Sequence, residues 1–97
     1  MKLRYTLPAL ADLNSILDYI SESSPRGAER VKLRIQRVTG LLLAQPRIGA
    51  PTDDPTVRRL STPPYPFLIF YEIAGDEIII HAVRHAARDP STMPGSE

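Results

Sequence analysis

The sequence contains no cysteine and no tryptophan, and it has two histidines in 97 residues. Without cysteine the protein can form no disulfide, no thiolate nucleophile and no cysteine-ligated metal site. His81 and His85 lack an acidic set at ligand spacing, so we expect neither a metal nor another cofactor. Stability must therefore come from side-chain packing.

Long apolar runs are missing as well. No segment approaches the roughly 18 apolar residues of a membrane-spanning helix, and the N-terminus lacks the basic start and apolar run of a secretion signal. We therefore expect a cytoplasmic protein with no membrane partner. A chain of 97 residues that is 42% hydrophobic and 24% charged predicts one small globular domain with a single core.

The net charge of +1 conceals a basic segment. One acid, Glu29, stands there among the basic residues Arg26, Arg30, Lys32, Arg34 and Arg37. No aromatic residue interleaves with these cations, so we expect no direct nucleic-acid binding. The segment is typical of the solvated face of an amphipathic helix, and it would also complement an acidic partner.

The first half of the sequence predicts a strand followed by two helices. Residues 2–6 alternate polar and apolar, as in a half-buried strand. Apolar residues from Leu10 to Ile20 recur at spacings of three and four, which predicts a helix over residues 8–22 with those side chains in the core. Ser24 and Pro25 then give the hydroxyl cap and proline that start a second helix.

The second helix has an apolar stripe from Ala28 to Leu42, so the two helices should form a packed hairpin. Gly40 lies inside this helix, where glycine is unfavourable. We interpret it as a point of close approach to a neighbouring backbone or as fraying near the helix end.

The second half predicts a loop over residues 45–56 and then three strands, over 57–61, 67–73 and 77–84. Helices followed by strands indicate an α+β fold of order β-α-α-β-β-β, with the helical hairpin on one face of a mainly antiparallel sheet. We assign residues 1–89 to this domain and residues 90–97 to a flexible tail.

Strand alternation predicts which side chains share a face. Ile79, His81, Val83 and His85 should lie on one face of the last strand, so a histidine there can be either a half-buried core residue or part of a functional cluster.

Arg58 and Arg59 should point to opposite faces of their strand. The arginine that faces the helices should pair with Asp12 or Asp18. Asp12 lies in the first turns of its helix, where a carboxylate favours the helix dipole, and the pair Asp18 and Glu22 is expected on the solvent face of that helix. Tyr65 stands among three prolines, so we expect it in a loop as the most exposed aromatic residue.

Several motifs over residues 3–89 resemble the ParE branch of the RelE/ParE toxin superfamily. They are Ala9-x-x-Asp12-Leu13-x-x-Ile16-x-x-Tyr19-Ile20, Leu42-x-x-x-Pro46-x-x-Gly49, Tyr65-Pro66-Phe67-Leu68-Ile69-Phe70-Tyr71 and Val83-Arg84-His85-x-x-Arg88-Asp89. The resemblance implies the toxin of a type II toxin–antitoxin system, neutralised in a complex with an acidic, partly disordered antitoxin. For the ParE branch it implies DNA gyrase as the target.

RelE-type members of the superfamily are ribosome-dependent messenger RNA endonucleases. Where they place arginines in the third strand and after the fourth, this chain has Leu68 and Ala86, and no tyrosine follows Tyr71. We therefore expect no catalytic residues and no enzyme activity. The alternative is a ribonuclease that uses other cations and imidazoles in their place: Arg59, Arg84, His85 and Arg88.

We predict two binding surfaces. The target-binding residues are Tyr65, Arg84, His85, Arg88 and Asp89, of which the last four lie at the end of the last strand and the start of the tail, where function comes at low structural cost. The antitoxin-binding residues are the basic positions Arg30, Arg34 and Arg37, which set a positive field for an acidic partner.

Overall fold

The computed structural model describes residues 1–87 and has the predicted α+β architecture. The elements are β1 (Lys2–Tyr5), α1 (Leu7–Ser23), α2 (Pro25–Ala44), β2 (Ala50–Pro51), β3 (Arg58–Thr62), β4 (Tyr65–Ala74) and β5 (Glu77–His85). The short strand β2 lies in the segment that we expected to be a loop. No helix among the described residues is long and apolar enough to cross a membrane.

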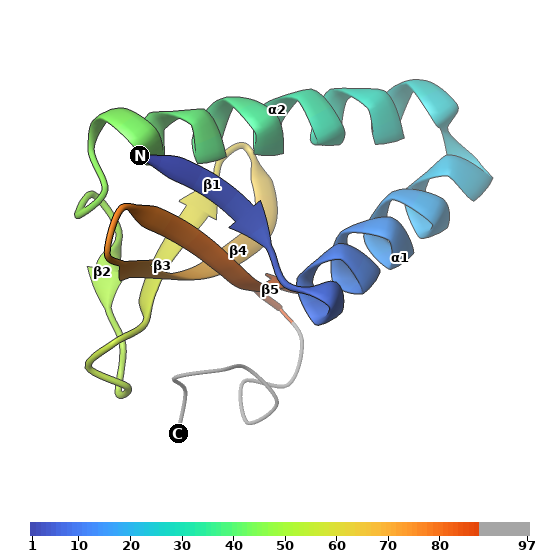
Figure 1. Cartoon of the computed structure of the whole chain (residues 1–97). Helices are drawn as coiled ribbons and strands as arrows, with labels where there is room; N and C mark the ends of the chain where they lie inside the picture. Colours follow the sequence, from blue (N-terminus) through green and yellow to red (C-terminus); the bar gives the residue numbers. More distant parts are fainter. Residues whose placement is uncertain (88–97) are drawn as a thin grey trace.

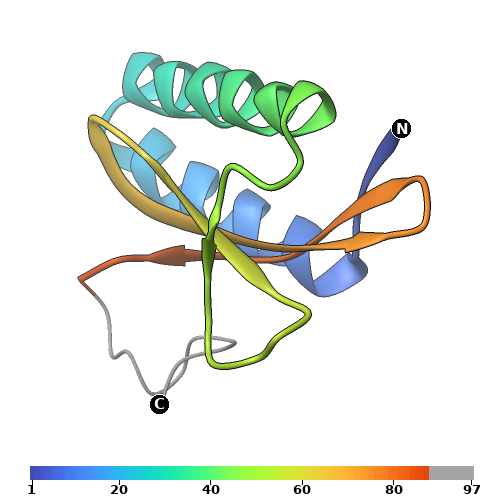
Figure 2. The ribbon, with the colours of Figure 1, turned by 90° about the vertical axis from the view of Figure 1, so that its left-hand side faces the viewer.

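The strands form one sheet in the order β1-β5-β4-β3-β2. Neighbours are antiparallel except for β1 and β5, which pair in parallel and bring the first strand against the last. Both helices lie on the same side of this sheet (Figures 1 and 2). In Figure 1, α2 runs across the sheet at the top, and α1 lies to the side, next to β5.

Both helices begin at hydroxyl caps. The Oγ1 atom of Thr6 accepts a hydrogen bond from the amide of Ala9 at 3.2 Å, and the Oγ atom of Ser24 accepts one from Gly27 at 2.9 Å. Each cap satisfies an amide that has no partner inside its helix. Both helices start within one residue of the predicted positions.

The main core lies between the helices and one face of the sheet. The apolar residues on the buried side of α2 are Val31, Ile35, Val38 and Leu42, as predicted, and Thr39 is buried beside them. In α1, however, Ala9 is wholly buried and Leu10 is 41% exposed, so the prediction of Leu10 in the core is wrong. The physical reason is that Thr6 bonds to Ile80 of β5, which turns the Ala9 side of the first turn toward the sheet.

Gly40 lies on the exposed surface of α2. A Cβ atom added there would meet no heavy atom within 4 Å, so the expectation of a close backbone approach is wrong.

The loop after α2 is fixed to the sheet by one tyrosine. The buried hydroxyl of Tyr71 donates to the carbonyl oxygen of Pro46 at 2.7 Å and accepts from the amide of Gly49 at 2.9 Å. Burial raises the pKa of Tyr71, which keeps the hydroxyl protonated as a donor. A Cβ atom at Gly49 would lie 2.6 Å from this hydroxyl oxygen, so only glycine fits.

Arg58 is the arginine that faces the helical side, because it pairs across the sheet with Tyr71. Its Nη1 atom donates to the carbonyl oxygen of Gly49 at 2.7 Å. The predicted partners Asp12 and Asp18 are wrong: the tightly turned loop presents backbone carbonyls to the guanidinium, and these satisfy it without a carboxylate.

The alternation predicted for β5 is interrupted by a bulge. Ile80 pairs with Tyr71 and Ala82 pairs with Phe70, so His81 is an extra residue without a pairing partner on β4. The predicted grouping of His81 with Val83 on one face is therefore wrong. After the bulge, Val83 joins the same core as Ile80, and Ala82 joins a small cluster on the opposite face of the sheet.

Candidate functional site

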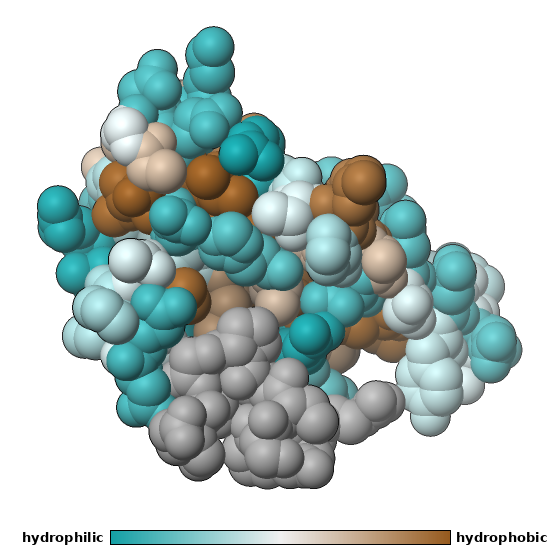
Figure 3. Space-filling view, turned by 60° about the horizontal axis from the view of Figure 1, so that its bottom comes forward, coloured by the Kyte–Doolittle hydropathy of each residue, from teal (hydrophilic) through white to brown (hydrophobic). Residues whose placement is uncertain are grey.

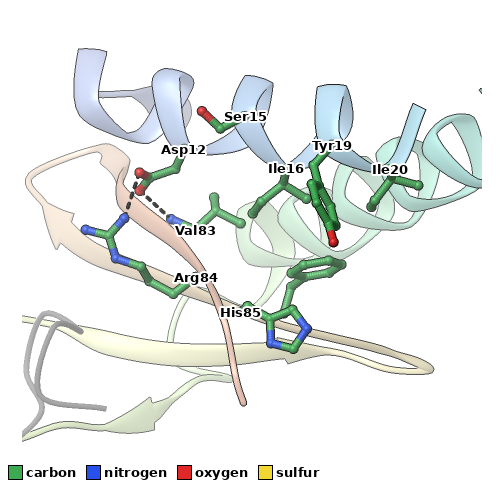
Figure 4. A pocket seen from close by; sticks show the side chains of 9 residues that line it. Asp12, Ser15, Ile16, Tyr19, Ile20, Val83, Arg84 and His85 are labelled. Atoms are coloured by element: carbon green, nitrogen blue, oxygen red, sulfur yellow. Dashed lines mark hydrogen bonds and ion pairs between the residues drawn. The ribbon is translucent and has the colours of Figure 1, made fainter. Parts of the chain in front are cut away.

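A groove of about 740 Å³ lies between α1 and the ends of β4 and β5 (Figure 4). One face of α1 supplies Asp12, Ser15, Ile16, Tyr19 and Ile20, at helical spacings of three and four residues. The sheet supplies Phe67, Val83, Arg84 and His85. Two of the predicted target-binding residues, Arg84 and His85, therefore lie together in one hollow.

Asp12 joins α1 to the outer edge of β5. Its Oδ1 atom lies 2.7 Å from Nη1 of Arg84, and its Oδ2 atom accepts a hydrogen bond from the amide of Val83 at 3.1 Å (Figure 4). β1 covers β5 only as far as the pair of Tyr5 and Ile80. Beyond that point the Asp12 carboxylate occupies the edge position that a neighbouring strand would fill.

Asp12 does pair with an arginine, but with Arg84 and not with Arg58 or Arg59 as predicted. Its side chain is 19% exposed because α1 presents it to β5. Asp18 and Glu22, further along the same helix, are exposed as expected. The sequence alone did not show which face of α1 meets the last strand.

His85 packs against an aromatic ring at the base of the groove. Its ring and that of Phe67 are edge to face, with centroids 5.5 Å apart and planes at 88°. The Nδ1 atom accepts a hydrogen bond from the amide of Ala87 at 3.1 Å, so the proton of the neutral ring is on Nε2. His85 is half-buried, as one interpretation held, and it lines the groove, while its part in a functional cluster stays a prediction.

The exposed aromatic residue is Tyr19, not Tyr65. Tyr19 is 71% exposed, and its ring extends from α1 toward the sheet (Figure 4). Tyr65 begins β4, is half-buried and packs against the main core, so its predicted place in an exposed loop is wrong. Strand β4 begins directly after Pro63 and Pro64, because Tyr65 already pairs with Thr62 of β3, and Pro66 lies within the strand. Tyr65 does not line the groove.

The other predicted residues lie elsewhere. Arg88 and Asp89 fall outside the described residues. Arg30 and Arg37 are exposed on α2, away from the groove, and Arg34 is half-buried on the same helix. Tyr19, Ile16 and Phe67 appear in the motifs of the sequence, but nothing in their spacing identifies them as one surface.

The charges in the described part of the groove are paired, and its surface is mainly apolar. Asp12 and Arg84 neutralise each other. Within residues 1–87 there is no group of three or more histidine, aspartate or glutamate side chains that could hold a metal ion. Seen from the side toward which β5 ends, hydrophobic surface forms separate patches among hydrophilic side chains (Figure 3). A partner would therefore be anchored at a few points.

Comparison with known proteins agrees with this fold. A family model for the ParE toxin of type II toxin–antitoxin systems, parDE, matches residues 3–90. The chain belongs to this family. The ParE family motifs that the sequence shows now have structural explanations, since Asp12 meets Arg84 and Pro46 and Gly49 meet Tyr71.

Two similar toxins and one solved structure support the assignment. The chain is 39% identical to "Toxin RelE2" of Caulobacter vibrioides over 87% of this chain and 93% of that protein. It is 35% identical to "Putative toxin Y4kP" of Sinorhizobium fredii over 88% of each. A solved chromosomal ParDE toxin–antitoxin system from P. aeruginosa superposes with a TM-score of 0.76 at 31% identity, covering 88% of this chain and 95% of that one.

Proposed function

We propose that this ParE-family toxin arrests growth by binding DNA gyrase and trapping the enzyme on cleaved DNA, and that a cognate antitoxin neutralises it. The groove beside α1 is the target-binding surface, with Tyr19, Arg84 and His85 at its rim and base. The observation that carries the proposal is the pairing of Arg84 with Asp12, which leaves an apolar groove with no unpaired cation among residues 1–87.

Part of the opposite face of the sheet is apolar. Leu68 stands where RelE-type members are expected to place an arginine. It packs with Val57, Phe70 and Ala82 in a small apolar cluster. A ribonuclease needs cations around the scissile phosphate and a group that accepts the 2′-hydroxyl proton. An apolar cluster supplies neither.

One relative is named RelE2, so a RelE-type ribonuclease is the competing function. The cations that such a ribonuclease could use are dispersed. Arg59 and Arg84 start from the same uncovered face, on β3 and β5, with β4 between them. The Arg84 guanidinium then turns to the outer edge of β5, where it meets Asp12. With the Arg84 guanidinium held at this edge and β4 between the two strands, the two cations are poorly placed to hold one phosphate between them.

A supercoiling assay with purified gyrase tests both the target and the surface. Wild-type toxin should block supercoiling, and Tyr19→Ala should need about tenfold more toxin, the loss expected for one aromatic anchor of an interface. Leu7→Ala is the matched control, because Leu7 is 81% exposed on the same helix but does not line the groove. Equal potency of the three proteins would exclude the groove, and no inhibition by any of them would exclude gyrase.

A further inference from the structure

The outward face of α2 carries a second surface. A residue advances about 100° around an α-helix, so five exposed positions fall within about 80° of one another. These positions are Arg26, Arg30, Leu33, Arg37 and Leu41, which we call the α2 stripe. The stripe lies opposite the buried side of α2 and points away from the sheet, where no other element of residues 1–87 covers it (Figure 1).

The charge of the α2 stripe is not compensated. Among residues 1–87, none of the cations of α2 forms an ion pair with a carboxylate. Glu29 is the one acid of the helix. Arg26, Arg30 and Arg37 therefore set a positive field along this face, which attracts a partner of opposite charge.

The leucines of the stripe distinguish between classes of partner. Leu33 is 55% exposed and Leu41 is 45% exposed, and both lie among the arginines. A phosphate backbone would leave these leucines without an apolar contact, and α2 has no aromatic residue on which bases could stack. An apolar side chain of a polypeptide would bury them. The stripe therefore favours an acidic protein segment over a nucleic acid.

We propose that the α2 stripe is the docking surface of the antitoxin, and that the docked segment is an acidic amphipathic helix. The proposal rests on the proposed function, in which an antitoxin neutralises this toxin. Leu33 and Leu41 are about 12 Å apart along the axis, two turns of helix, so the partner's apolar anchors should be seven or eight residues apart. Its carboxylates should lie over Arg30 and Arg37.

Arg34, the third predicted antitoxin contact, has a different position. It flanks the stripe, is half-buried, and its Nε atom is buried without a hydrogen-bond partner among the described residues. We therefore assign the main charge contacts to Arg30 and Arg37 and place Arg34 at the margin of the interface.

The test measures binding kinetics of the full-length toxin with the antitoxin encoded beside its gene, at low and high salt. Arg30→Glu with Arg37→Glu should slow association about tenfold at low salt and remove most of its salt dependence. Leu33→Ala should speed dissociation about tenfold, as loss of a buried anchor does. Lys32→Glu with Arg59→Glu is the matched control, with the same charge change at exposed positions outside the stripe.

The proposal is overturned if the stripe variants and the control variant show the same kinetics. It is also overturned if the charge reversals abolish binding to duplex DNA, or inhibition of gyrase, and leave antitoxin kinetics unchanged. If the wild-type toxin binds no antitoxin, both this proposal and neutralisation by an antitoxin fail. If wild type binds and Leu33→Ala dissociates at the wild-type rate, only the docking surface is wrong.

Discussion

Asp12 shows how one side chain can serve the fold and the site together. Its two oxygens satisfy different groups of β5, the amide of Val83 and the guanidinium of Arg84. Because β1 does not reach this part of β5, the amide would otherwise remain without a strand partner. Asp12 therefore closes an open sheet edge and also fixes Arg84 at the rim of the groove.

Substitution of Asp12 should separate these two roles. Asp12→Asn keeps an oxygen that accepts from Val83 and loses the ion pair, so we expect a loss of about 1 kcal/mol in the free energy of unfolding. Asp12→Ala leaves both groups of β5 unsatisfied and should lose about 2 to 3 kcal/mol. Urea denaturation measures the difference. Equal stability of Asp12→Ala and wild type would show that the contact contributes nothing.

Replacement of glycine by alanine should lower the stability of the protein at Gly49 and raise it at Gly40. Gly49→Ala places a Cβ atom against the Tyr71 hydroxyl and should cost about 1 to 3 kcal/mol. Gly40→Ala adds a methyl group to open space on a helix and should stabilise the protein by about 0.5 to 1 kcal/mol. Thermal unfolding of both variants checks the pair. A melting temperature that moves in the same direction for both would contradict these packing assignments.

At the scale of elements, local signals predicted the regular structure well. Apolar spacing placed the first helix, a hydroxyl cap and proline placed the start of the second, and β-branched and aromatic runs placed three strands. Strand β2 was missed, because a two-residue edge strand with a proline carries no periodicity of its own. The bulge at His81 was missed as well, since its sequence is an ordinary strand sequence and only pairing with β4 reveals it.

The site was predicted only where it depends on one segment. Arg84 and His85 at the end of β5 were identified, and both line the groove. Asp12, Ile16 and Tyr19 were not assigned to it, although they lie on one face of α1. Their role depends on where α1 lies against β5, and contacts between elements far apart in the chain set that position.

At the scale of the whole molecule, the toxin has two surfaces of different character. The groove beside α1 is mainly apolar, and the charges of Asp12 and Arg84 in it neutralise each other. The α2 stripe is basic and carries exposed leucines. They lie on different elements, so an antitoxin on the stripe would not fill the groove directly. Neutralisation would then depend on the rest of the antitoxin, which can extend from the stripe toward the groove or block the approach of a large target.

The stoichiometry of inhibition distinguishes a toxin that traps gyrase from one that cleaves messenger RNA. Toxin is titrated against a fixed concentration of purified gyrase with plasmid DNA and ATP, and linear DNA is quantified after protein denaturation. A toxin that acts by binding should give linear DNA that rises with toxin and saturates once gyrase is fully occupied. Absence of linear DNA at any toxin excess, together with cleavage of messenger RNA on ribosomes by toxin far below the ribosome concentration, would contradict the account.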